Sequence, residues 1–136
     1  MSDMIEVTDK AISPEAVITE VKSDSSGCVV TYVGLIRDNS QGKPVLSVEY
    51  RDCGRHAENT LRTIASEVRQ RWQIKNIAIV HRVGRLSVGD INLVVAISSA
   101  HRVEGFAACQ YVIDQFKNRL PTSKTEIYGT AAHWGD

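Results

Sequence analysis

The chain of 136 residues lacks the features that mark several common classes of protein. It has only three cysteines, Cys28, Cys53 and Cys109, which are widely spaced and form no CxxC or CxxH pattern. This spacing argues against a disulfide framework and against a zinc site, and it fits a reducing cytoplasm best. No apolar run approaches the ~18 residues of a membrane span, and the N-terminus has no basic segment followed by an apolar one. We therefore expect an unanchored cytoplasmic protein.

An excess of charge of one sign is also lacking. Sixteen lysines and arginines balance sixteen aspartates and glutamates, and no run of like charges occurs. The broad positive field of a nucleic-acid binder or of a protein that binds anionic membranes is therefore absent, and any anion site must be local. The length is typical of one ordinary domain, and the sequence has no repeat or linker. We expect a single domain over residues 1–136.

Hydrophobic patterns predict a mixture of strands and helices. Five strands are expected at residues 4–8, 27–37, 45–51, 74–84 and 91–100, and three helices at residues 14–22, 55–72 and 100–119. The strand at 45–51 should pair beside the strand at 27–37, and residues 85–90 should form a turn around Gly89 and Asp90. Because neighbouring strands form pairs between packed helices, this order favours an α+β fold over a doubly wound parallel sheet.

Two lysines lie on either side of the residue that ends the last predicted helix. Lys117 belongs to the final turn, Pro121 stops the helix, and Lys124 follows on another element. In one continuous helix the two would lie roughly 10 Å apart along the axis, whereas a turn at Pro121 lets both ammonium groups point to one place. A cation near a helix C-terminus is also favourable in itself, by ~0.3–1 kcal/mol. On these residues alone, a structural role for Lys117 is the better explanation.

The start of the last predicted helix is a second candidate anion site. If Ser99 is the N-cap, His101 and Arg102 lie in the first turn, where free backbone amides and the helix dipole favour a negative group. Arg102 would add a bidentate fork suited to phosphate or carboxylate. The alternative is that both cations simply lie on the surface. Arg37, at the end of a predicted strand, is a further candidate at the rim of a site.

Other polar residues carry weaker signals. Cys53 precedes His56 by three residues, but a thiol nucleophile also requires a third, orienting group. His81 enters a predicted turn, and we interpret it as structural. The four histidines of the chain have no metal-ligand spacing.

Several motifs taken together point to one known family. They are "HRVGRLSVGD", then "SSAHRVEGFAACQYVIDQFKNRLP", then "SKTE" and a late Trp134, preceded by "VTYVGLIRDNS" and "LSVEYR". In this order they resemble the large, catalytic subunit of molybdopterin synthase. The resemblance implies an α/β-hammerhead-like α+β fold, with a mixed or antiparallel sheet, two longer helices and one short N-terminal helix.

The resemblance also implies partners and a reaction. A homodimer of this subunit would bind a small ubiquitin-like sulfur-carrier subunit at each end, giving a heterotetramer. The carrier's Gly-Gly tail bears a C-terminal thiocarboxylate, and its sulfur is transferred twice to cyclic pyranopterin monophosphate. This sulfurtransferase step builds the dithiolene of molybdopterin during molybdenum cofactor biosynthesis. It implies no metal and no redox cofactor for the step, and neither nucleic acid nor membrane as a partner.

The resemblance carries over residue by residue. By position, the match gives active-site lysines at Lys117 and Lys124, residues of the substrate and phosphate side at Arg37, His101 and Arg102, and the acid of the final motif at Glu126. It implies that Lys117 pairs with the thiocarboxylate and moves a proton, while Lys124 stabilises developing charge or acts as the acid for the opening phosphate. We accordingly expect both lysines to share one cleft with the two residues that open the last helix.

The run "PTSKTE" departs from the family pattern. Ser123 and Thr125 stand where relatives usually have tryptophan and a second basic residue, so the pocket wall loses aromatic surface and a charge. Two alternatives follow. One is a catalytically weak paralogue that binds the carrier tail as a binding or regulatory module. The other is a phosphate-binding domain unrelated to sulfur transfer.

Overall fold

The computed structural model describes residues 3–129 of the chain, so Trp134 lies outside the described residues. The elements follow in the order β1 (Met4–Thr8), α1 (Pro14–Val21), β2 (Cys28–Leu35), β3 (Asn39–Ser40), β4 (Lys43–Arg51), a 3-10 turn (Cys53–Arg55), α2 (Ala57–Arg71), β5 (Asn76–Arg82), β6 (Gly84–Ser87), β7 (Ile91–Ser99), α3 (Arg102–Asn118) and β8 (Ser123–Tyr128). Two long helices and one short helix combine with mixed strand pairings. The α+β fold expected from the sequence is confirmed.

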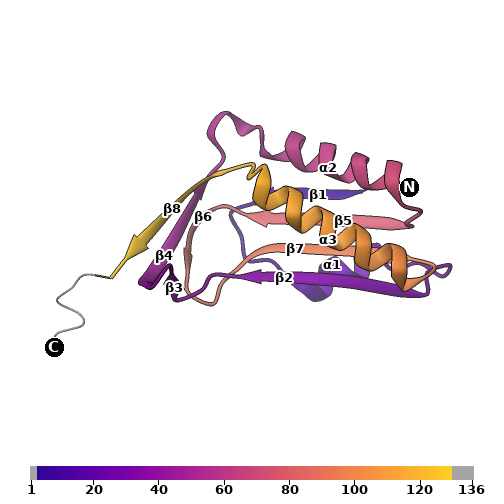
Figure 1. Cartoon of the computed structure of the whole chain (residues 1–136), viewed down its shortest axis with the longest axis horizontal. Coiled ribbons are helices and arrows are strands. Elements are labelled where there is room, and N and C mark those ends of the chain that lie inside the picture. The colour runs from indigo at the N-terminus through magenta and orange to yellow at the C-terminus, as the bar shows by residue number, and fades with distance from the viewer. Residues whose placement is uncertain (1–2, 130–136) are drawn as a thin grey trace.

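The first sheet has the strand order β1-β5-β7-β2, with β1 parallel to β5 and the other pairs antiparallel. Helices α2 and α3 cover one face and α1 covers the other (Figure 1). Alternate residues of β5 face the two sides, so Ile77 and Ile79 pack with the long helices while Ala78 and Val80 pack against α1. Because both faces are covered, the central strands are continuously apolar over residues 77–80 of β5 and 93–97 of β7.

The second sheet lies at one end of the first, on the left of Figure 1. β4 pairs with β6 along one edge and with β8 along the other, and it forms a short hairpin with β3. This sheet has its own small core, which contains Ile36, Val45, Val48, Tyr50 and Leu86. The molecule thus has a large core under α2 and α3 and a separate small core in the second sheet.

The second sheet corrects three expectations. The strand at 45–51 does not pair beside β2, because β4 belongs to the other sheet, and the partner of β2 is β7. Residues 85–87, expected in a turn, belong to β6, since the chain bends at Gly84 (φ +96°) and passes from one sheet to the other. The turn is confined to Ser87–Asp90, where the Asp90 amide donates to the Ser87 carbonyl at 3.0 Å. Residues 123–128, expected as a tail, form β8.

The start of α3 also differs from expectation. His101 occupies the N-cap position and makes no capping bond with its side chain. The Ser99 hydroxyl instead donates to the His101 carbonyl at 2.6 Å, so Ser99 is not the cap. At its other end α3 stops at Asn118, and the chain turns through Pro121 into β8.

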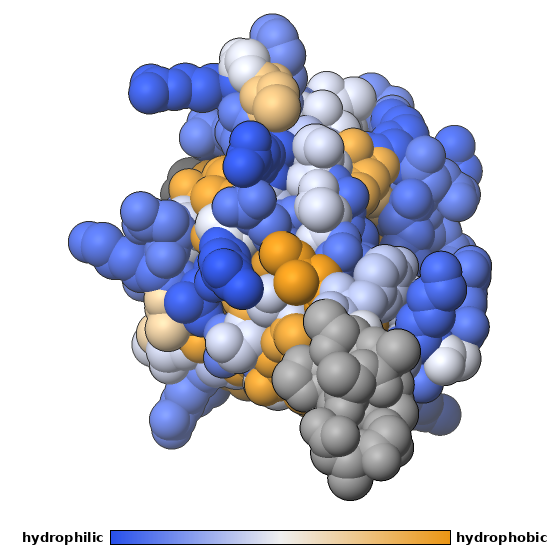
Figure 2. Space-filling model, turned by 90° about the vertical axis from the view of Figure 1, so that its left-hand side faces the viewer, coloured by the Kyte–Doolittle hydropathy of each residue, from blue (hydrophilic) through white to orange (hydrophobic). Residues whose placement is uncertain are grey.

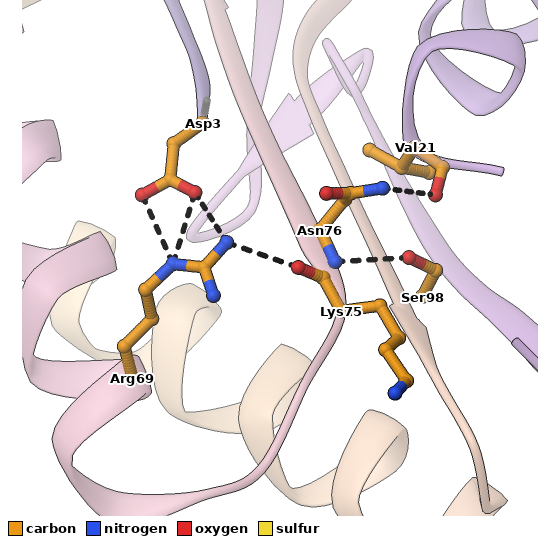
Figure 3. A network of polar contacts seen from close by, with 6 residues as sticks. All are labelled: Asp3, Val21, Arg69, Lys75, Asn76 and Ser98. Atoms are coloured by element: carbon orange, nitrogen blue, oxygen red, sulfur yellow. Dashed lines mark hydrogen bonds and ion pairs between the residues drawn. The ribbon is translucent and has the colours of Figure 1, made fainter. Parts of the chain in front are cut away.

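A network of polar contacts fixes the end of the first sheet that lies away from the second (Figure 3). Arg69 of α2 donates to the Asp3 carboxylate at 2.6 Å and to the Lys75 carbonyl at 3.1 Å. The Asn76 side chain donates to the Val21 carbonyl at the end of α1. The C-terminal ends of both helices are therefore tied to the start of β5.

Within residues 3–129, no helix has the combined length and apolar character that crossing a membrane requires.

Candidate functional site

A groove of about 610 Å³ opens where the first sheet, the second sheet and the end of α3 meet. Three cationic residues from three separate elements line it: Arg37 after β2, Lys117 in the last turn of α3, and Lys124 on β8. Other lining residues include Tyr32, Gly34, Ser40, Tyr50, Asn92, Phe116, Leu120 and Glu126. The groove lies between the two hydrophobic cores, because it takes residues from both sheets.

The turn at Pro121 brings the two lysines to this groove from different directions. Lys117 projects from a helix, whereas Lys124 comes from a strand that runs antiparallel to β4, with Tyr50 as its cross-strand partner. Both lysines are exposed to solvent along the groove. The structure therefore places them together in the way that the break in the helix indicated.

Glu126 connects Lys124 to the groove wall. One Glu126 carboxylate oxygen accepts from the Tyr128 hydroxyl at 2.7 Å and from the Ser40 hydroxyl at 3.1 Å. The other lies 3.8 Å from the Lys124 ammonium. The hydrogen bond from Tyr128 is the main cause that lowers the pKa of Glu126, and Ser40, Lys124 and Arg37 act in the same direction. The carboxylate is thus held ionised beside Lys124.

The wall of the groove contains two residues that the sequence did not single out. The Asn92 side-chain amide donates to the Tyr50 hydroxyl at 3.0 Å, and burial raises the pKa of Tyr50. Asn92 belongs to none of the motifs quoted above, and Tyr50 lies within "LSVEYR" without any feature that marks it as a site residue. They come together only because β4 and β7 belong to two sheets that meet here.

His101 and Arg102 do not lie in the groove. They open α3 and line surface hollows at its start, whereas Lys117 lies in its last turn. The axial rise of a helix separates His101 from Lys117 by about 24 Å. The expectation that all four cations share one cleft is therefore wrong for a single chain, because a straight helix of 17 residues keeps its two ends apart.

The end of the molecule that carries the second sheet presents hydrophobic residues among hydrophilic ones, as Figure 2 shows. Exposed apolar side chains include Leu35 in the groove wall, which is 57% exposed, and Leu46 on β4, which is 52% exposed. Apolar surface next to a cationic groove suits a peptide segment that has both apolar and anionic groups.

The groove's ionic groups are ammonium, guanidinium and one carboxylate, a set that suits anions rather than metal ions. Across residues 3–129, no cluster of three or more His, Cys, Asp and Glu side chains is arranged to hold a metal. The fold and the groove together define an α+β protein whose groove has the charges that suit an anionic ligand.

Comparison with known proteins gives the family. The family model described as "MoaE protein" matches residues 7–119. The human molybdopterin synthase catalytic subunit is 39% identical over 132 residues, which cover 97% of this chain and 70% of the human protein. The crystal structure of molybdopterin synthase from Staphylococcus aureus superposes with a TM-score of 0.87 at 29% identity, covering 96% of each chain. The chain belongs to the MoaE protein family, and the resemblance seen in the sequence is confirmed.

The fold also occurs in a two-subunit assembly. A chain in the solved complex of subunits 1 and 2 of molybdopterin-converting factor from Helicobacter pylori has a TM-score of 0.71 over 93% of this chain and 90% of that one. At 12% identity this likeness concerns the fold alone.

Proposed function

We propose that this chain is the catalytic subunit of a molybdopterin synthase, a sulfurtransferase of molybdenum cofactor biosynthesis. It would transfer sulfur from the thiocarboxylated C-terminus of a small ubiquitin-like carrier subunit to cyclic pyranopterin monophosphate. Family membership supports the reaction, and the observation that carries it is the convergence of Lys117, Lys124 and Arg37 in one groove.

The charges of the two reactants explain why such a groove is needed. A thiocarboxylate and a cyclic phosphate are both anions, and two unit charges 4 Å apart repel by about 4 kcal/mol at the effective dielectric constant near a protein surface. Cations from three elements around one groove offset this repulsion and also stabilise the charge that develops on oxygen during transfer. The exposed apolar side chain of Leu35, in the groove wall, would contact the carrier.

We assign the roles as follows. Lys117 pairs with the thiocarboxylate and moves a proton during attack by sulfur and hydrolysis of the acyl intermediate. Lys124 stabilises developing negative charge, and Glu126 orients it from 3.8 Å away. Arg37 binds the anionic substrate at the rim.

His101 and Arg102 require a second copy of the chain in this proposal. Because α3 holds them about 24 Å from Lys117, they serve the site only if a partner subunit brings its own α3 start to the groove. A homodimer with a carrier at each end, giving a heterotetramer, meets this condition.

The three cysteines are free, which supports a reducing cytoplasmic setting.

The test is direct conversion of the precursor by the purified protein with thiocarboxylated carrier. Lys117→Ala should lower the rate at least about a hundredfold while the protein stays folded, because a preorganised charge-stabilising group is typically worth ~2.7–4 kcal/mol. Lys10→Ala, at an exposed lysine after β1, is the matched control and should keep the wild-type rate.

Two results would overturn the assignment. A Lys117→Ala variant at the wild-type rate would show that this lysine is not catalytic. Wild-type protein that binds the carrier tail yet forms no product would favour the weak paralogue, and protein that captures no Gly-Gly-tailed partner would favour the general phosphate-binding domain.

A further inference from the structure

We propose that His81 is a positioning residue that fixes the two groove lysines relative to each other. This inference rests on the proposed function and deepens it. His81 lies at the end of β5, is fully buried, and belongs to the first sheet. Its ring lies between that sheet, α3 and the second sheet, on the inner side of the groove wall.

Both ring nitrogens are engaged. Nδ1 lies 2.9 Å from the Asn92 carbonyl oxygen, and Nε2 lies 2.8 Å from the Thr122 hydroxyl oxygen. A carbonyl oxygen only accepts, so Nδ1 carries the hydrogen and donates it. In the neutral ring Nε2 then accepts from the Thr122 hydroxyl. Burial lowers the pKa of His81, which favours this neutral form.

Two aromatic rings hold the imidazole from the sides. The Tyr50 ring lies 5.0 Å away at 82°, and the Phe116 ring lies 4.9 Å away at 84°, both edge-to-face. Such arrangements are favourable and restrict rotation of the ring. With both nitrogens bonded as well, the ring has one orientation, and it fixes the residues around it.

Three of these contacts lead to a lysine. Phe116 directly precedes Lys117, and Thr122 precedes Lys124 by two residues. Tyr50 is the cross-strand partner of Lys124. His81 thus joins the backbone that carries one lysine to the backbone that carries the other. The hydrogen bond to Thr122 acts most directly on the spacing of the two lysines. Thr122 is buried and lies in the short connection between α3, which carries Lys117, and β8, which carries Lys124.

Packing alone would not require this arrangement. An apolar side chain would fill the same space without two hydrogen bonds that must both be made in a buried site. A polar ring with directional bonds sets the position of the connection, which matters where two side chains from different elements must meet a substrate within a fraction of an ångström.

The experiment compares Thr122→Val with Thr122→Ser in the conversion assay with carrier and precursor. Valine keeps the shape but leaves Nε2 without its donor, whereas serine keeps the hydroxyl. We expect Thr122→Val to lower kcat about tenfold to a hundredfold with KM for the carrier nearly unchanged, because misplacement of a reacting group acts mainly on the chemical step. Thr122→Ser should recover most of kcat. Thermal unfolding of both variants shows whether they are folded at the assay temperature.

Three results of this comparison would overturn the positioning role of His81. Equal, wild-type kcat values for the two variants would overturn the positioning role, and so would a loss that valine and serine share equally. A loss in Thr122→Val that merely follows the fraction of folded protein would also overturn it.

A second measurement does not depend on activity. Imidazole ¹H–¹⁵N correlation spectra should show His81 with hydrogen on Nδ1, and Thr122→Val should shift its Nε2 resonance. A charged ring or hydrogen on Nε2 at neutral pH would overturn the bonding described here. Wild-type protein that fails to convert the precursor, yet shows this tautomer, would refute the proposed function and leave the role of His81 in fixing the connection intact.

Discussion

Glu126 is the residue whose ionisation links the groove to the stability of the second sheet. It accepts hydrogen bonds from Ser40 and Tyr128 and lies beside Lys124, so its charged form has partners on β3 and on β8. These partners lower its pKa below the ordinary value of 4.5. A carboxyl group with a lowered pKa in the folded state stabilises that state only while it is ionised.

The pH dependence of unfolding should reveal this contribution. The stabilisation is fully present above about pH 4.5 and is lost as the pH falls further, towards the lowered pKa of the folded state. Glu126→Gln should therefore flatten the dependence of the unfolding temperature on pH below that value. Glu20→Gln, at an exposed residue of α1, is the control and should leave the wild-type profile unchanged. Identical profiles for wild type and Glu126→Gln would contradict the prediction.

Gly34 makes room for the groove wall. A Cβ on this residue would lie 2.7 Å from the Asn92 side-chain oxygen and 3.1 Å from the Tyr32 ring. Gly34→Ala must then displace Asn92 and weaken its hydrogen bond to Tyr50. We expect a loss of about 1–3 kcal/mol in the free energy of unfolding, typical of an overpacked site. Urea unfolding measures this loss. The control is Val33→Ala, one position earlier at a partly exposed residue, which should lower the free energy of unfolding by less.

At the scale of elements, α2 and α3 are joined by an ion pair between Glu67, in the C-terminal half of α2, and Arg119. Arg119 makes two hydrogen bonds to the Glu67 carboxylate, which also accepts from the Tyr111 hydroxyl at 2.6 Å. The hydrogen bond from Arg119 is the main cause that lowers the pKa of Glu67. Because Arg119 directly follows α3, this pair holds the end of the helix from which Lys117 projects.

Arg119→Met should therefore destabilise the protein by about 1 kcal/mol, a modest value because both side chains are about one-third exposed and water screens the pair. Arg62→Met, which breaks the more exposed pair with Glu58 within α2, is the matched control and should cost roughly 0.3–0.5 kcal/mol. Chemical unfolding at low and high salt measures the free energy of unfolding of both variants. A loss in Arg119→Met no larger than the loss in the control would contradict the prediction.

The helices were more predictable from the sequence than the strand partners. Leu61, Ile64 and Val68 recur with the helical period because α2 rests on one face of a sheet. β8 has no such signal, because most of its side chains are exposed or half-buried. β6 has four residues, of which only Leu86 is buried. Which strand lies beside which depends on contacts between distant segments, and local periodicity does not encode them.

The candidate site was predictable to the extent that its residues lie near a visible break in structure. Lys117 and Lys124 drew attention because Pro121 separates them, whereas their roles and that of Glu126 came from the resemblance to the family. The length of α3 already implied that His101 lies far from Lys117, since a continuous helix keeps its ends apart. His81 was interpreted as structural, but its link to the groove was not predictable because its contacts come from four segments that only the fold brings together.

For the whole molecule, the separation of the two cationic sites predicts complementation between inactive variants. In a dimer that shares its sites, Lys117→Ala and Arg102→Ala subunits would form mixed dimers in which one site carries both changes and the other carries none. Co-expression of the two should then restore about a quarter of the wild-type activity if subunits pair at random in a two-fold symmetric dimer. No recovery in isolated mixed dimers would show that each chain works alone.

The two separate hydrophobic cores have a consequence for how this enzyme class can diversify. Lys117 is anchored through the large core and Lys124 through the small one, so the gap between their ammonium groups depends on the tilt of one sheet against the other. Substitutions where the two sheets meet, remote from any reacting atom, would increase or decrease the distance between the two ammonium groups. The distance between the two lysines can then change during evolution while the reactive groups themselves stay the same.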